Sequence, residues 1–316
     1  MALKIAIQMD PIESVNVDAD TSFDMALEAF TRGHEIWVYH PDRLKLLSGR
    51  VSAGAQKVKH LQRKQGDHVR LEPFAALDLH EMDVVLIRQD PPFNMAYITA
   101  AQILERLQPD VLVLNDPKSI RDAPEKLFVT DFADLTPPTL ITRDLEAMRA
   151  FREEYKDIIL KPLYGNGGAG VFRIKPDDAN FNALLEMFDE TFDEPSIMQQ
   201  FLPDVSAGDK RIILLDGEAV GAINRIPAKG ETRSNMHVGG RAEGVEMSAR
   251  DQEICDRIGP ILSERGLIFV GIDVIGDYLT EINVTSPTGV QEVRRFGGAD
   301  ISALFLDWIE GRIQTR

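Results

Sequence analysis

A glycine-rich segment near the middle of the chain has the composition of a phosphate-binding loop. Its glycines, four within six residues, are Gly165, Gly167, Gly168 and Gly170. Glycine tolerates positive φ and lets the backbone approach a ligand closely, so successive N–H groups can point at one phosphate. A strand pattern follows at residues 171–174, whereas a dinucleotide fingerprint needs a helix there. We therefore predict a flap between two strands that closes over phosphates; a hairpin tip with no ligand is the alternative.

Three oxygen-bearing side chains further along the chain suit a divalent cation such as magnesium, which takes carboxylate and amide ligands. Glu281 and Asn283 stand two positions apart, so in a strand both side chains lie on one face. Asp273 shares that face only if the hairpin that turns at residues 276–277 contains a bulge or a three-residue loop. We predict one of these two irregularities. The alternative for all three residues is the exposed polar face of a half-buried strand.

Basic residues that can neutralise phosphate accompany these two features. Lys126 falls on a predicted short helix, and Lys161 directly precedes the glycine segment. Between residues 210 and 241, six basic residues stand against three acidic ones, although charge alone is also typical of a solvated surface. Residues 230–241 combine glycines with Arg233 and His237, which is typical of a lid that folds onto a phosphorylated ligand and excludes water. A surface loop fits that segment equally well.

The composition is that of an ordinary globular protein. The 316 residues, 44% hydrophobic and 27% charged, predict two or three packed units. The 35 basic and 51 acidic residues give a net charge of −16, which repels polyanions and argues against a nucleic-acid partner. No apolar run approaches the roughly 18 residues of a membrane helix. Cys255, the single cysteine, lies among apolar residues and is predicted to be buried and unreactive; we expect a cytoplasmic protein.

The order of the predicted elements changes near residue 122. Before it, strands alternate with helices, which predicts an open, mostly parallel α/β sheet. Residues 48–65 show no clear period and are interpreted as an irregular insertion or a hairpin. After residue 122, strand pairs with tight turns alternate with helices, which predicts antiparallel α+β construction. These pairs are expected at residues 157–160 with 171–174, 211–215 with 218–225, and 268–275 with 278–284.

Seven short strings are spread over almost the whole chain. They are Met9-Asp10-Pro11, Arg88-Gln89-Asp90-Pro91-Pro92, Glu125-Lys126-Leu127-Phe128, Lys161-Pro162-Leu163, Asp209-Lys210-Arg211, Arg225-Ile226-Pro227 and Glu281-Ile282-Asn283-Val284-Thr285-Ser286-Pro287-Thr288. Together they resemble the bacterial glutathione synthetases, a family of the ATP-grasp ligases. The resemblance implies an α/β N-terminal open sheet (pre-ATP-grasp) in residues 1–122, followed by an α+β ATP-grasp fold in residues 123–316. The latter would divide into a small lid subdomain, about 123–202, and a C-terminal catalytic subdomain, about 203–316.

The resemblance also implies a reaction and a role for each candidate residue. The family uses ATP and Mg²⁺ or Mn²⁺ to ligate γ-glutamylcysteine to glycine through an acyl phosphate, giving glutathione, ADP and phosphate. The implied metal ligands are Asp273, Glu281 and Asn283. The implied ATP-binding residues are Lys126, Lys161, Gly165, Asn166, Gly167, Gly168, Gln199, Gln200, Leu202 and Asp209, the last at the ribose. The implied catalytic residues are Arg211, Arg225 and Arg233, and those for the peptide are Arg88, Ser286, Pro287 and Thr288.

Three other functions compete with this interpretation. Another ATP-grasp ligase, adding an amino acid to a different acyl acceptor, would carry the same phosphate and metal residues. A non-catalytic nucleotide-binding module would tolerate loss of the metal row, which this sequence keeps. A dinucleotide-dependent oxidoreductase needs a strand-to-helix glycine loop, which is not found. The expected partners are therefore small molecules, with neither nucleic acid nor membrane, and the family implies a homo-oligomer.

Overall fold

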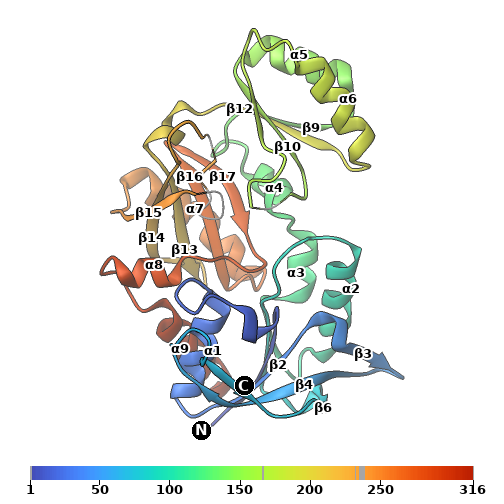
Figure 1. Cartoon of the computed structure of the whole chain (residues 1–316), viewed down its shortest axis with the longest axis vertical. Helices are drawn as coiled ribbons and strands as arrows, with labels where there is room; N and C mark the ends of the chain where they lie inside the picture. Colours follow the sequence, from blue (N-terminus) through green and yellow to red (C-terminus); the bar gives the residue numbers. More distant parts are fainter. Residues whose placement is uncertain (1, 166, 232, 235–238, 316) are drawn as a thin grey trace.

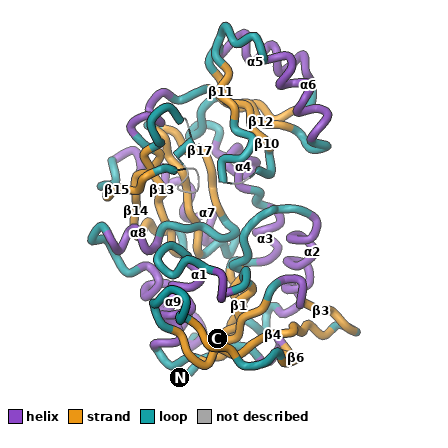
Figure 2. The backbone as a smooth tube through the Cα atoms, in the orientation of Figure 1, coloured by secondary structure: helices purple, strands orange, loops and turns teal. Residues whose placement is uncertain are grey.

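The computed structural model describes residues 2–165, 167–231, 233–234 and 239–315. Within them the strands form three sheets of eight, four and five strands. Figures 1 and 2 show the sheets following one another along an elongated molecule, with the four-stranded sheet in a lobe at one end. No helix in the described ranges is long and apolar enough to cross a membrane.

The first sheet is built around four parallel strands in the order β2-β1-β7-β8. The strands are β1 (Lys4–Gln8), β2 (Glu35–Tyr39), β7 (Val84–Ile87) and β8 (Leu112–Leu114). The helices that alternate with them are α1 (Thr21–Thr31), α2 (Met95–Leu104) and α3 (Pro117–Asp122). The carboxyl ends of parallel strands share one edge, so the loops after β1 and β7 meet there. The alternating pattern predicted from the sequence is confirmed.

Of the two alternatives for residues 48–65, the irregular insertion is wrong and the hairpin is confirmed, since antiparallel strands pair across the turn at residues 48–49. This segment contains β4 (Arg50–Leu61), a 12-residue strand that pairs with β2 and with three shorter strands. Those strands are β3 (Leu44–Leu47), β5 (Val69–Leu71) and β6 (Ala75–Asp78). The inward positions at the start of β4 are Val51, Ala53 and Ala55, all buried. Alanine has little β propensity, so this alternation gave a weak signal, and the sheet is mixed rather than mostly parallel.

The four-stranded sheet belongs to a lobe with its own apolar core. Its strands, in the order β11-β10-β12-β9, are β9 (Thr139–Thr142), β10 (Ile158–Pro162), β11 (Phe172–Ile174) and β12 (Ser196–Gln200). Helices α5 (Leu145–Tyr155) and α6 (Phe181–Thr191) supply the rest of the lobe. Met148, Leu160, Phe188 and Met198 are among the residues of its core, which is separate from the other two apolar clusters of the described chain. We call this unit, residues 139–200, the middle lobe, because it comes from the middle of the sequence.

The five-stranded sheet is antiparallel throughout, as predicted. Its strands, in the order β15-β14-β13-β16-β17, are β13 (Asp209–Leu215), β14 (Glu218–Ile226), β15 (Arg241–Gly244), β16 (Phe269–Ile275) and β17 (Tyr278–Asn283). The helices of this region are α7 (Ala249–Glu264), α8 (Val290–Arg295) and α9 (Ile301–Gln314), while α4 (Glu125–Phe128) precedes the middle lobe. Cys255 on α7 is buried, as expected, and burial raises the pKa of its thiol to about 12.

A buried ionic cluster joins the first and last parts of the chain. Asp24 on α1 is 2% exposed and accepts hydrogen bonds from Arg63, from Arg294 on α8 (2.7 Å) and from the hydroxyl of Ser302 on α9 (2.6 Å). Figure 1 shows α1 and α9 side by side at the base of the molecule. Removing one member of such a cluster leaves the opposite charges without a partner.

We expect Asp24→Ala to lower the free energy of unfolding by about 3 kcal/mol, at the lower end for a broken buried pair because both arginines are partly exposed. Urea denaturation followed by circular dichroism measures this loss. The matched control is Asp307→Ala, which removes an exposed partner of Arg32 and should cost less than about 1 kcal/mol. Equal losses in the two variants would contradict the role given to Asp24.

Candidate active site

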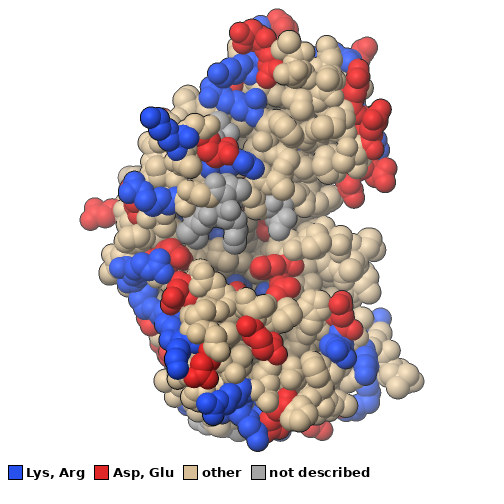
Figure 3. Space-filling view, in the orientation of Figure 1, with Lys and Arg blue, Asp and Glu red and all other residues tan. Residues whose placement is uncertain are grey.

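A cavity of about 270 Å³ lies between the middle lobe and the five-stranded sheet, and the loop after β7 also borders it. Its walls include the glycine segment, the hairpin β16–β17, the start of α4 and the turn at residues 286–288. Figure 3 shows the surface hollowed between the middle lobe and the rest of the molecule. Nearly all the candidate residues named from the sequence line this cavity. They are Lys126, Lys161, Gly165, Gly167, Gly168, Gln199, Gln200, Leu202, Asp209, Arg211, Arg225, Arg233, Asp273, Glu281, Asn283, Ser286, Pro287 and Thr288.

A bulge in the β16–β17 hairpin brings the two acidic candidates together. Ile275 pairs with Tyr278 across the two-residue turn, but the register then shifts and Asp273 pairs with Glu281. Without this shift Asp273 would lie opposite Thr280. The predicted irregularity is therefore confirmed, in the form of a bulge. Asn283, two residues beyond Glu281, donates to Asp273 from Nδ2 to Oδ2 at 3.5 Å, so the three side chains share one face.

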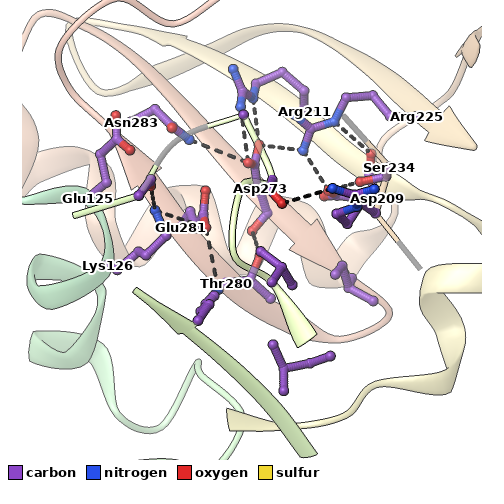
Figure 4. A pocket seen from close by; sticks show the side chains of 18 of the residues that line it. Glu125, Lys126, Asp209, Arg211, Arg225, Ser234, Asp273, Thr280, Glu281 and Asn283 are labelled. Atoms are coloured by element: carbon purple, nitrogen blue, oxygen red, sulfur yellow. Dashed lines mark hydrogen bonds and ion pairs between the residues drawn. The ribbon is translucent and has the colours of Figure 1, made fainter. Parts of the chain in front are cut away.

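Asp273 on β16 is held by two arginines, one from the neighbouring strand β13 and one from β14, the strand beyond it (Figure 4). Arg211 on β13 donates through Nε to Oδ1 at 2.5 Å and through Nη2 to Oδ2 at 3.0 Å, and Arg225 on β14 approaches Oδ1 at 2.9 Å. Burial alone would raise the pKa of Asp273, but the two guanidinium charges outweigh it and hold that pKa well below its usual range. The carboxylate therefore stays ionised.

Glu281 is held in the same way by two lysines. Lys126 Nζ lies 3.6 Å and Lys161 Nζ 3.4 Å from Glu281 Oε1, and both lysines are less than 10% exposed. Burial would raise the pKa of Glu281, but the two lysine charges lower it. Burial also lowers the pKa of Lys161, helped by the charge of Lys126 and opposed by that of Glu281. The two ammonium groups, which repel each other, thus share one carboxylate.

Asp209 extends this buried network. Its Oδ2 accepts from Arg225 Nη2 at 2.7 Å and from the hydroxyl of Ser234 at 2.5 Å. Arg225 therefore bridges Asp209 and Asp273. Nothing in the sequence marked Ser234, because a single serine in a polar segment carries no pattern. A role for Asp209 at a ribose stays a prediction.

The glycine segment has the backbone that its composition predicts. Gly167, Gly168 and Gly170 have φ between 61° and 80°, a region that other residues enter only with strain. The carbonyl of Gly165 accepts from Lys126 Nζ, and that of Gly168 accepts from Arg233 Nη1 at 3.3 Å. Asn166, together with residues 232 and 235–238 of the predicted lid, His237 included, lies outside the described residues.

The end of β12 forms the opposite wall, where the sequence predicts nucleotide contacts. The side chain of Gln199 donates to Thr139 Oγ1 on β9 at 3.0 Å, so it is engaged within its own sheet. Apolar side chains that the sequence did not single out also line the cavity: Ile159, Val171, Val205 and Ile275. Apolar side chains can pack against the faces of a flat aromatic base.

The candidates for the peptide lie at the other end of the cavity. Arg88 is 5% exposed and donates to Ser22 Oγ at 3.2 Å and to the carbonyl of Pro287 at 3.1 Å. It therefore supports the turn at residues 286–288 from behind, while the turn itself lines the cavity. Ser286 Oγ donates to Asp90 Oδ1 at 2.9 Å. Direct contact between Arg88 and a substrate stays a prediction.

Two acidic residues in the lining were missed by the sequence analysis. Asp90 and Glu125 belong to strings that carry the family resemblance, but neither was assigned a role. Glu125 Oε1 accepts from Thr285 Oγ1 at 3.2 Å, and burial raises the pKa of Glu125, opposed by the charge of Lys126. Asp90 lines the cavity from the loop after β7 and Glu125 from the start of α4, so the signal was their position in the sequence close to Arg88 and Lys126.

The cavity fits a divalent cation only together with a second source of ligands. Asp273, Glu281 and Asn283 offer two carboxylates and one amide, which suit a hard cation. In the described part of the chain, no three His, Cys, Asp or Glu side chains are grouped to hold a metal on their own. A cation here would therefore need further oxygens, such as those of a bound nucleotide.

Family models match both parts of the chain. The N-terminal domain model of prokaryotic glutathione synthetase matches residues 3–121, and the ATP-grasp domain model of the same family matches residues 125–298. This chain belongs to the prokaryotic glutathione synthetase family. Membership of this family implies the use of ATP and, in general, of a divalent metal. It agrees with the fold, in which an open sheet precedes the two antiparallel sheets.

Relatives of known name cover the whole chain. The glutathione synthetase of Mesorhizobium japonicum is 60% identical over 99% of both chains, and that of Vibrio parahaemolyticus is 45% identical over 99% of both chains. Among solved structures, D-cycloserine synthetase DcsG is similar with a TM-score of 0.69 at 14% identity, covering 98% of this chain and 99% of that one. The ATP-grasp ligase PsnB is similar with a TM-score of 0.64 at 18% identity, covering 98% and 99%. These two likenesses concern the fold.

We expect the free protein to bind Mn²⁺ weakly and to bind it more than about tenfold more tightly when an ATP analogue is present. The reason is that Asp273 and Glu281 each already face two cations, which the nucleotide phosphates would draw away. Electron paramagnetic resonance of unbound Mn²⁺ measures both affinities. Asn283→Leu should weaken only the binding seen with nucleotide. Tight Mn²⁺ binding at this site without nucleotide would contradict the expectation.

Proposed function

We propose that this protein joins the cysteinyl carboxylate of γ-glutamylcysteine to the amino group of glycine at the expense of ATP. The observation that carries the proposal is the pair of carboxylates, buried Asp273 and half-buried Glu281, each facing two cations in a cavity bordered by a glycine loop. That arrangement occurs in a chain whose named relatives match it from end to end. The products are glutathione, ADP and phosphate.

The chemistry requires an activated carboxylate, because a carboxylate and an amine do not react in water. Transfer of the γ-phosphoryl group of ATP to the peptide carboxylate gives an acyl phosphate and ADP. The glycine nitrogen, once it has lost a proton, attacks the acyl carbon, and phosphate leaves with the electron pair of the C–O bond. No protein side chain forms a covalent bond, so catalysis consists of positioning and charge stabilisation.

The four buried cations divide this work. In the proposal, Lys126, Lys161 and the N–H groups of the glycine loop bind the ATP phosphates. Arg211 and Arg225 stabilise the charge on the transferring phosphoryl group and on the tetrahedral intermediate. Arg233, whose guanidinium donates to the carbonyl of Gly168 in the glycine loop, assists them.

The carboxylates have a separate role. Asp273, Glu281 and Asn283 would hold Mg²⁺ or Mn²⁺, which neutralises phosphate charge when it is bound. The side chains themselves keep the nearby arginines and lysines oriented, since each cation is hydrogen-bonded or ion-paired to them. In this proposal Asp209 binds the ribose, and the backbone of Gln199, Gln200 and Leu202 binds the base.

The residues proposed to bind the peptide complete the assignment of the cavity. Ser286, Pro287 and Thr288 would contact the peptide, with Arg88 supplying positive charge behind them. An acyl phosphate is lost when water reaches it, so the site needs a cover. We infer that residues 123–202 act as this cover, that residues 203–316 carry the charged network, and that residues 1–122 bind the peptide.

The decisive assay is phosphate release from ATP with γ-glutamylcysteine, in the presence and absence of glycine. We expect rapid release and formation of glutathione, identified by mass, only when all three substrates are present. The acyl phosphate is protected from water until glycine arrives, so omission of glycine should leave a slow rate. Ligation of glycine to other acids but not to γ-glutamylcysteine would overturn the substrate assignment and favour a different ATP-grasp ligase.

Glu281→Gln should lower turnover by roughly 100- to 1,000-fold, because the amide cannot balance two lysines or serve as an anionic metal ligand. Steady-state ADP formation at saturating Mg²⁺ measures the loss, and near-UV circular dichroism checks that the fold is kept. The matched control is Glu218→Gln, an exposed glutamate on β14 of the same sheet, which should leave turnover unchanged. Near-normal turnover of Glu281→Gln would remove this residue from the site.

A further inference from the structure

Two aromatic rings connect the middle lobe to the N-terminal sheet. Phe93, in the loop between β7 and α2, stacks on Tyr164, which directly precedes the glycine loop. The ring centroids are 6.1 Å apart and the planes are inclined by 26°. The apolar core of the middle lobe is made of its own residues, so the stack is an apolar contact made outside that core.

The Phe93 side of the stack rests on a rigid support. Phe93 also packs against Tyr97, with ring centroids 5.3 Å apart. Tyr97 is buried in the first turn of α2, where the side chain of Asn94 accepts from the N–H groups of Ala96 and Tyr97 and caps the helix. The ring of Phe93 is thus fixed by a capped helix.

The loop that carries Phe93 also reaches the proposed peptide end of the cavity. Asp90, three residues before Phe93, accepts from Ser286 Oγ at 2.9 Å, and its own N–H donates to Asp10 Oδ2 at 2.9 Å. Asp90 and Ser286 both line the cavity. A change in the position of this loop therefore changes the position of the turn at residues 286–288.

The Tyr164 side of the stack is attached to the proposed phosphate site. The carbonyl of the next residue, Gly165, accepts from Lys126 Nζ, and Gly165 itself lines the cavity. The preceding residue, Leu163, is buried. Tyr164 is 36% exposed and lies between these two fixed neighbours, so its ring moves with the root of the glycine loop.

We propose that Phe93 and Tyr164 are positioning residues that make nucleotide binding and dipeptide binding favour each other. The inference rests on the proposed function, because it assigns the two ends of the cavity to these ligands. A nucleotide bound by the glycine loop holds Tyr164 against Phe93, and the loop of Phe93 then holds Asp90 and Ser286 in place for the dipeptide. Thermodynamic linkage makes the effect reciprocal, so the dipeptide tightens the nucleotide by the same factor.

The test is calorimetric titration of the protein with a non-hydrolysable ATP analogue and Mg²⁺, with and without saturating γ-glutamylcysteine. We expect the dipeptide to tighten analogue binding about 3- to 10-fold in the natural protein, the range that one aromatic stack can supply. Tyr164→Leu and Phe93→Leu should each reduce this factor to near one, and the double variant should lose no more than either alone. Tyr164→Phe keeps the ring and should keep the factor.

Tyr155→Leu is the matched control. It makes the same substitution in the same lobe, but the ring of Tyr155 packs on Phe151 within that lobe, with centroids 4.5 Å apart. In this variant the dipeptide should still tighten analogue binding about 3- to 10-fold. The control therefore distinguishes a loss of coupling from a general loosening of the lobe. A natural protein without coupling, a Tyr164→Leu variant that retains it, or a Tyr164→Phe variant that loses it would each overturn the inference.

The outcomes also separate this inference from the proposed function. A natural protein that makes glutathione but shows no coupling overturns only the role of the ring stack. A natural protein that binds the analogue but does not bind γ-glutamylcysteine overturns both proposals. Coupling that disappears in Tyr164→Leu, with glutathione still formed at a raised KM for the dipeptide and a similar kcat, supports both.

Discussion

Two carboxylates that lie side by side on one hairpin set the electrostatic requirement of this site. The bulge in β16–β17 makes Asp273 and Glu281 direct cross-strand neighbours, and like charges in that position repel. Asp273 is buried and Glu281 is half-buried, so water screens their charges poorly and the protein itself balances them. Four cations do this, two for each carboxylate. The remaining features of the site follow from where these cations come from.

The four cations are contributed by separate parts of the chain. Arg211 and Arg225 lie on strands of the same sheet, whereas Lys126 lies on α4 and Lys161 on a strand of the middle lobe. Charge balance therefore draws the middle lobe and α4 onto the five-stranded sheet and defines the cavity between them. A negatively charged phosphate in that cavity competes with the carboxylates for the same lysines, which gives the lobe a reason to respond to its ligand.

The sequence predicted those parts of the site that depend on residue type and local spacing. The two-residue spacing of Glu281 and Asn283, with the need to place Asp273 on their face, was sufficient to predict an irregularity, either a bulge or a three-residue loop, and the structure has the bulge. The glycine content of the segment at residues 165–170 likewise indicated positive φ values, which Gly167, Gly168 and Gly170 have. The pairing of Lys126 with Glu281 spans 155 positions, and no local pattern encodes it. The contact of Ser234 and the Phe93–Tyr164 stack were not predicted for the same reason. Ser234, Phe93 and Tyr164 are isolated positions in the sequence, and each becomes informative only beside its partner.

Among the fold elements, β4 is one that the sequence left open, because residues 48–65 were interpreted as an irregular insertion or a hairpin and the hairpin alternative holds. Its buried positions are filled partly by alanine, which satisfies the geometry of a sheet without the strong β preference of valine or isoleucine. The parallel strands β7 and β8 consist of valine, leucine and isoleucine alone, and runs of this kind supported the predicted alternation of strands and helices before residue 122. Recognition of the family supplied the boundaries and roles that periodicity alone leaves open.

The anchoring of α1 has a consequence for synthesis on the ribosome. Asp24 and Ser302 are 278 positions apart, so α1 emerges long before α9 exists. At a translation rate of about 5–20 residues per second, the interval is roughly 14 to 56 s. During that time Asp24 has Arg63 alone as a partner among the residues of its cluster, and the face of α1 that later meets α9 is open to solvent. The nascent N-terminal segment is thus prone to aggregation until α9 has been synthesised and covers this face of α1.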